Sequence, residues 1–144
     1  MRAFSLIESL VAIGIMVLLM TLGIPAFRGR QQAVNLQSDA RTLLSDLRLA
    51  QQRTVGEQTT YLVKLFTTSP QKYQVLKRSG GDTLIKEHAL TSGVSWQNTG
   101  GFTNDEIVFT TTGAVVQSGT VILQNTASQT ISVEVKPSGY VRVQ

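Results

Sequence analysis

The sequence predicts an α+β protein in which one long N-terminal helix packs against a β-rich antiparallel head. Three observations lead to this prediction. An apolar run near the N-terminus carries no charged residue from Ser9 to Phe27. An amphipathic pattern follows the run, and after Thr59 the composition shifts to β-branched residues, Gln, Ser and Gly. A helical period followed by short strands with close turns is typical of a helix packed on antiparallel sheets.

The apolar run is long enough to cross a bilayer core, which takes about 20 apolar residues. Glu8 lies just inside its N-terminal end. A carboxylate in hydrocarbon costs roughly 2.5–3.5 kcal/mol on membrane-insertion scales. Two interpretations follow: a signal anchor whose acid reaches the interface, or a Glu8 that pairs with a positive group inside the membrane. Cleavage between Ala3 and Phe4 would create such a group, an α-amine at Phe4 that a staggered neighbour presents, and the pair would fix the axial register of an assembly.

The segment Ala3-Phe4-Ser-Leu-Ile-Glu8 resembles the processing site of type IV prepilins and type II secretion pseudopilins. This resemblance implies cleavage by prepilin peptidase, N-methylation of Phe4, and a role for Glu8 in subunit register. Pro25 stands where these proteins carry a helix-kinking proline, whereas Ala3 stands where they usually carry Gly.

The same resemblance implies a single span of the inner membrane, with the N-terminus in the cytoplasm and the head on the periplasmic side. The charges that flank the run are equivocal on this point, because Arg2 precedes it while Arg28 and Arg30 follow it. The expected partners are other pilin or pseudopilin subunits, prepilin peptidase and the membrane.

After the apolar run, small and leucine side chains recur at spacings of four, three, four and three residues: Leu36, Ala40, Leu43, Leu47 and Ala50. The charged residues lie off this stripe: Asp39, Arg41, Asp46, Arg48 and Arg53. We expect one helix from about Phe4 to Arg53, kinked near Pro25, with Gly56 as its terminator. The alternative is a separate short helix that begins after Pro25 or Gly29.

The head is expected to be a series of short antiparallel strands. The predicted strands are residues 60–66, 72–78, 83–89, 94–97, 106–110, 114–117, 120–124, 130–135 and 140–143. Turn motifs separate them, among them the hairpin motif Ser79-Gly-Gly-Asp82. The predicted organisation is a leader at 1–3, a transmembrane and filament-core helix at 4–27, an amphipathic helix at 28–56, and the head at 57–144.

The order of the head resembles the GspH-type minor pseudopilins and the related FimT and FimU minor pilins. The residues that carry this resemblance are the stretch from Leu43 to Arg53, the later Glu106-Ile-Val-Phe-Thr-Thr-Thr-Gly113, and the closing Ser138-Gly-Tyr-Val-Arg-Val143. It implies a non-enzymatic subunit built into a filament tip.

The composition argues against catalysis. The chain has 144 residues, a formal net charge of +4, no cysteine, and His88 as its only histidine, so we expect no cofactor, metal centre or catalytic group. His88 is expected on the surface, and Trp96, Phe102 and Phe109 in the core.

Some FimT-type pilins bind DNA through a C-terminal Gly-Arg-x-Arg-like segment. Here the stretch Gly139-Tyr140-Val141-Arg142 keeps only one arginine, so Arg142 is the candidate DNA contact and nucleic acid is a disfavoured partner.

Three functions stay open from the sequence. The leading hypothesis is a GspH-like minor pseudopilin of a type II secretion pseudopilus, which serves protein secretion. The second is a FimT- or FimU-like minor pilin of a type IV pilus, in pilus assembly or DNA uptake. The third is a membrane-anchored adhesive β-domain that does not polymerise.

Overall fold

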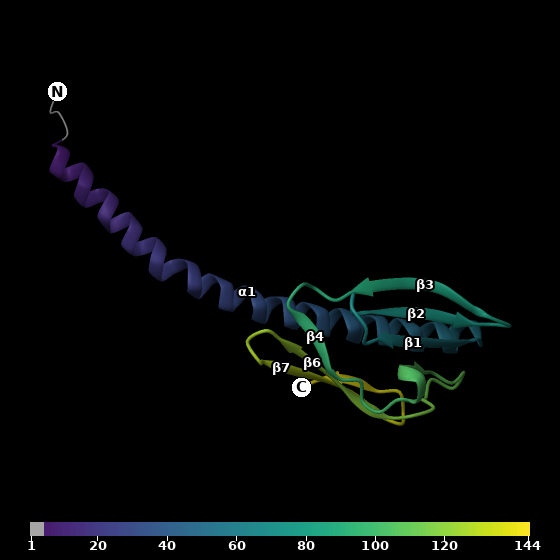
Figure 1. Ribbon diagram of the computed structural model, residues 1–144. Coiled ribbons are helices and arrows are strands. Elements are labelled where there is room, and N and C mark those ends of the chain that lie inside the picture. The colour runs from purple at the N-terminus through teal and green to yellow at the C-terminus, as the bar shows by residue number, and fades with distance from the viewer. Residues whose placement is uncertain (1–4) are drawn as a thin grey trace. The chain divides into compact units, whose positions relative to one another are not determined.

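The computed structural model (Figure 1) describes residues 5–144, and of residues 22–28 it describes only the backbone. The chain divides into two compact units, Met1–Gln31 and Gln32–Gln144. The first unit is the N-terminal part of a helix, and the second contains the rest of that helix together with all the strands.

Helix α1 spans Leu6–Glu57, which confirms one long N-terminal helix. It continues past the predicted end at Arg53 and through Gly56, so Gly56 is not the terminator. The chain leaves the helix at Gln58, which takes the left-handed conformation with φ 50° that often ends helices. The predicted kink at Pro25 lies outside the residues whose side chains are described.

The strands are β1 Thr60–Phe66, β2 Lys72–Arg78, β3 Asp82–Ala89, β4 Val94–Asn98, β5 Glu106–Val108, β6 Gly119–Asn125, β7 Thr130–Val135 and β8 Val141–Val143. They form two antiparallel sheets of four strands, in the orders β3-β2-β1-β5 and β4-β6-β7-β8. A short 3-10 helix, Thr103–Asp105, precedes β5. The hairpin at residues 79–82 joins β2 to β3 as predicted.

One predicted strand, residues 114–117, is wrong. Val115 makes a single bridge to Phe109, and its amide donates to the carbonyl of Pro137 at 3.2 Å. Two hydrogen bonds flank this bridge, from the amide of Thr110 to the carbonyl of Ala114 at 2.8 Å and from the amide of Val116 to the carbonyl of Val108 at 2.9 Å. The chain then bends at residues 116–117, so the pairing ends after this single bridge.

Within the second unit, the predicted leucine stripe is the helix's contribution to the core. Leu43, Leu47 and Ala50 have no exposed surface. They pack in one cluster with Tyr61 and Tyr73 of the first sheet and with side chains of the second sheet: Val121, Leu123, Val133 and Val135. Trp96, Phe102 and Phe109 are buried in this cluster, which confirms their predicted place. The amphipathic half of α1 therefore contributes to a core shared by both sheets.

Candidate functional site

The N-terminal part of α1 exposes its apolar side chains. Their exposed fractions run from 54% at Val11 to 82% at Leu6. The exposed set is Leu6, Ile7, Leu10, Val11, Ile13, Ile15, Met16, Val17, Leu18, Leu19 and Met20. Contiguous apolar surface of this extent marks a site of contact with other helices or with lipid.

Among the described residues, no helix combines the length and the apolarity that crossing a bilayer requires.

The residues of the processing motif lie at the start of this helix. Glu8 is in the first turn of α1, is exposed, and forms no ion pair with a described residue. Its amide donates to the carbonyl of Ser5 at 3.0 Å. Ala3 and Phe4, predicted to flank the cleavage site, lie outside the described residues. Their predicted roles, and that of Glu8, stay predictions.

Two carboxylates of α1, Asp39 and Asp46, are buried at the junction between the helix and the first sheet. They are 1% and 3% exposed. The hydroxyl of Tyr73 donates to Asp46 at 2.8 Å, and the ammonium of Lys86 lies 2.7 Å from the same carboxylate. Burial raises the pKa of Tyr73 far above its ordinary value, and the hydrogen bond to Asp46 adds to this. Asp46 thus ties α1 to both β2 and β3.

Asp39 makes the second such link. It accepts hydrogen bonds from the amide of Thr91 at 2.8 Å and from its hydroxyl at 2.9 Å. The His88 ring nitrogen Nε2 lies 3.2 Å from Asp39, and the ring packs against Tyr73 with 5.3 Å between centroids. His88 is therefore only partly exposed, because its ring packs between the helix and Tyr73, and it is more buried than the predicted surface position suggested. The sequence signal for this junction was the seven-residue spacing of Asp39 and Asp46, which puts both on one side of the helix, next to the leucines.

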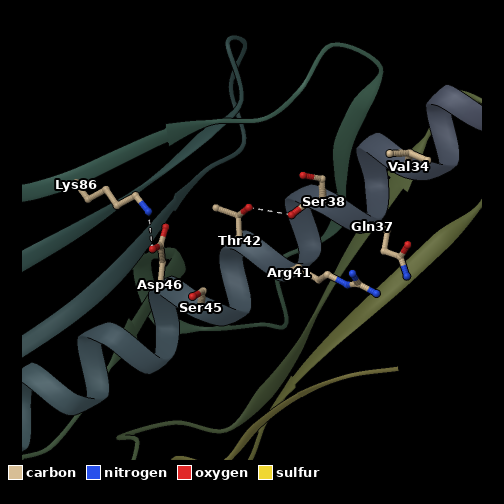
Figure 2. Close-up of a pocket in the computed structure, with 8 residues that line it drawn as sticks. All are labelled: Val34, Gln37, Ser38, Arg41, Thr42, Ser45, Asp46 and Lys86. Atoms are coloured by element: carbon tan, nitrogen blue, oxygen red, sulfur yellow. Dashed lines mark hydrogen bonds and ion pairs between the residues drawn. The ribbon is translucent and has the colours of Figure 1, made fainter.

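The outer side of α1 carries a polar groove of about 470 Å³ (Figure 2). Val34, Ser38, Thr42 and Ser45 line it along the helix, with Gln37 and Arg41 on one side and Asp46 and Lys86 on the other. In Figure 2 the Arg41 side chain points away from Lys86, so two cations border opposite sides of the groove. The groove can therefore bind a ligand by hydrogen bonds and by charge.

The basic side chains of β2, which could form an anion-binding patch, are each paired with an acid. Lys72 lies 2.9 Å from Glu87, and Lys77 lies 2.7 Å from Glu57. Arg78 lies 2.8 Å from Asp82 and 3.1 Å from Glu106. The hydrogen bond from Arg78 lowers the pKa of Asp82.

At the C-terminus, Arg142 donates to Glu134, which also accepts from Gln144 at 3.2 Å. A paired cation gains less from a phosphate than a free one, since its charge is already compensated. The predicted DNA contact at Arg142 stays a prediction, with its charge partly neutralised in this structure.

No set of three His, Cys, Asp or Glu side chains within residues 5–144, as far as they are described, is grouped so that it could hold a metal ion.

Comparison with known families and structures gives consistent matches. A family model described as Type II transport protein GspH matches residues 39–139. No curated protein sequence matches the chain significantly.

Among solved structures, the minor pseudopilin EpsH from the Type 2 Secretion System of Vibrio cholerae superposes with a TM-score of 0.65 at 12% identity, covering 76% of this chain and 96% of EpsH. The type IV minor pilin FimU of Pseudomonas aeruginosa superposes with a TM-score of 0.62 at 15% identity, covering 82% of this chain and 92% of FimU. At these identities the two structures show a shared fold.

Proposed function

Because this chain belongs to the GspH family of type II transport proteins, we propose that it is a non-enzymatic minor pseudopilin of a type II secretion pseudopilus. In this proposal prepilin peptidase cleaves between Ala3 and Phe4, Phe4 is methylated, and the chain waits in the inner membrane with its head in the periplasm. It is then built into the tip of a short filament that serves protein secretion.

One observation supports the proposal most. The N-terminal part of α1 has large apolar side chains that are at least 54% exposed, and none of them belongs to the core cluster of the head. Such a surface is stable in lipid or against other helices, and not in water. A subunit that moves from a membrane into a helical bundle buries this surface first in lipid and then against neighbouring helices.

Glu8 supplies the register in this mechanism. The new amine at Phe4 and the Glu8 carboxylate are four residues apart, roughly 6 Å along a helix at 1.5 Å per residue. A neighbour displaced along the filament axis brings its own amine beside this carboxylate. In an apolar surrounding an unpaired charge is strongly unfavourable, so only registers that pair the two groups are stable.

The direct test is Glu8→Gln in the full chain, with Glu8→Asp as the charge-retaining control. We expect at least about a tenfold loss of the chain from isolated filaments in Glu8→Gln, since the neighbour's amine is left unpaired in an apolar bundle. Immunoblots of filament and membrane fractions measure this, and the membrane amount should not change. Equal incorporation of Glu8→Gln and wild type would exclude the register mechanism.

Mass spectrometry of the mature N-terminus tests processing separately. The expected result is a chain that begins at methylated Phe4. An intact Met1 or Arg2 in the filament or membrane pool would contradict the proposed cleavage.

A second candidate is a minor pilin of a type IV pilus, because the FimU structure shares the fold over most of both chains. Deletion of the gene for this chain distinguishes the two candidate functions. Loss of type II protein secretion with surface pili intact supports the pseudopilus, and loss of pili with secretion intact supports the pilus.

A further inference from the structure

The structure divides the charges of the second unit unevenly between the head and the outer face of α1. In the head, six of the basic side chains have an acidic partner within 4 Å: Lys64, Lys72, Lys77, Arg78, Lys86 and Arg142. On α1, Arg41 and Arg48 are exposed, and neither forms an ion pair with a described residue. The uncompensated positive charge is therefore concentrated on the helix.

The buried acids of α1 explain this imbalance. Between Gln32 and Gly56 the helix has two acidic residues, Asp39 and Asp46, and both are buried against the head, although Asp46 also borders the groove. Asp39 is bonded to Thr91 and His88, and Asp46 to Tyr73 and Lys86. Neither carboxylate is available to the arginines on the outer face. An arginine on a helix is stabilised by an acidic residue three or four positions away. Arg41 and Arg48 have no acidic residue at these positions.

The groove of Figure 2 lies beside this unpaired positive charge on α1. Its floor consists of small side chains that carry hydroxyl groups, Ser38, Thr42 and Ser45, so another chain can come close to the helix backbone. Arg41 borders one side, and on the other side the half-exposed Lys86 is paired with Asp46, so the uncompensated charge at the groove is that of Arg41. Arg48 lies seven residues after Arg41, on the same side and roughly 10 Å further along the helix axis. Its guanidinium donates a hydrogen bond to the carbonyl oxygen of Val141 at 3.3 Å.

We propose that this groove, bordered by Arg41 and Lys86, binds an acidic segment of a different filament subunit; the inference rests on the proposed function as a filament component. Guanidinium and serine hydroxyl donors together match carboxylates, with two parallel bonds available from each arginine. The Thr42 hydroxyl already donates to the carbonyl of Ser38 at 2.9 Å. The exposed Val34, at 58%, adds apolar contact that a protein partner uses and a phosphate does not.

A second copy of this head is a poor occupant, because its carboxylates already have partners. Glu57, Asp82, Glu87, Glu106 and Glu134 are each paired with a basic residue, and Asp105 accepts from the Thr99 hydroxyl at 2.7 Å. Binding a second head would require breaking these pairs. Charge complementarity therefore favours a heterotypic contact, with a sibling subunit that has unpaired acids.

The test places a photo-crosslinker in the groove. The sequence has no cysteine, so Ser45→Cys in the full chain gives a unique thiol for benzophenone maleimide. Ser118→Cys, on an exposed loop, is the positional control. After irradiation of isolated filaments, mass spectrometry identifies the adducts. We expect Ser45→Cys to crosslink to a different subunit with an acidic contact segment.

Charge variants in the Ser45→Cys background then test the role of Arg41. Arg41→Glu should lower the heterotypic crosslink by about tenfold, since like charges then face each other. Lys136→Glu, an equal charge change in the head outside the groove, should leave the yield unchanged.

Four results would overturn the inference: adducts only with a second copy, adducts only with lipid or nucleic acid, a Ser45→Cys chain that is present in filaments and forms no adduct, or a yield that Arg41→Glu does not lower. In each of these the chain is still in the filament, so the proposed function stands. Absence of the wild-type chain from filaments would instead remove the proposed function and this inference with it.

Discussion

The two halves of helix α1 differ in what their apolar residues contact. Residues 6–20 expose every large apolar side chain by half or more, whereas Leu36, Leu43 and Leu47 of the second half are 2% exposed or less. Both halves are rich in the same aliphatic residues. The difference teaches that the second half finds its partner inside the head, while the described apolar side chains of the first half stay exposed and, in the proposed function, find theirs in lipid or in neighbouring subunits.

The polar residues repeat this division. In the second half, Asp39 and Asp46 are buried because Thr91, His88, Tyr73 and Lys86 supply donors to them. In the first half, Glu8 has no charged partner among the described residues. A carboxylate can be removed from water at low cost only where such donors are in place. The buried acids of the second half therefore have their donors within the head, whereas Glu8 is exposed.

The largest expected effect comes from truncating the helix's contribution to the core. Leu47→Ala should lower the free energy of unfolding of the head by about 2–5 kcal/mol, because it removes buried methyl groups and leaves a cavity. The single tryptophan, Trp96, is buried in the same core and reports unfolding by its fluorescence during denaturant titration of the full chain in detergent.

Leu18→Ala is the matched control for this comparison. Leu18 is 62% exposed, so the same chemical change should leave the Trp96 unfolding midpoint where it is. If both variants shifted the midpoint equally, the N-terminal half would share a core with the head and the contrast between the halves would fail.

A smaller effect is expected from the buried acid at the junction. Asp46→Ala leaves the Tyr73 hydroxyl and the Lys86 ammonium without their partner, which should cost about 1–3 kcal/mol of unfolding free energy. Asp46→Asn keeps an acceptor for Tyr73 and should cost less. The same titration measures both, and an Asp46→Ala chain as stable as wild type would show that this link does not hold the helix to the sheets.

The smallest effect is electrostatic and concerns surface pairs. The pKa of Glu87 is lowered, first by the hydrogen bond from Gln74 and then by that from Lys72. A lowered pKa means that the pair's contribution is fully present above the unfolded pKa of about 4.3 and is lost as the pH falls through the lower folded value.

Unfolding midpoints of wild type and Glu87→Gln should therefore differ slightly at pH 7 and at pH 5, and converge once the pH has fallen through the lowered folded pKa of Glu87. Because the pair is exposed, the difference should also shrink in high salt. A gap between the two chains that widens on acidification would contradict the direction of this shift.

Several elements followed from local pattern. The leucine stripe, the strands β1, β2 and β7 and the hairpin between β2 and β3 are where periodicity and turn residues predicted them. In each, neighbouring residues in the chain carry the signal. The predicted strand at 114–117 was wrong because the chain bends at 116–117, where the Gln117 side chain bonds the amide of Thr103 and the carbonyl of Gly101, and no local pattern records these distant contacts.

The candidate site was predicted less completely. The motif around Glu8 could be read directly, since its chemistry lies in consecutive residues. The groove beside Arg41 and Lys86 could not, because it joins residues of α1 to a residue of β3 that lies 40 to 52 positions further along the sequence.

The sequence by itself determined the long helix, its division into an unbroken apolar part and an amphipathic part, and the β-rich head, because these depend on the spacing of apolar residues along one chain. The tertiary structure decided which charged side chains are paired and which are unpaired. Asp39 and Asp46 look like solvated acids in the sequence, and only the packing of β2, β3 and the Thr91 loop buries them and leaves the arginines on the outer face uncompensated. The physical reason is that a charge is stabilised by whatever lies within a few ångströms of it, and folding sets that distance.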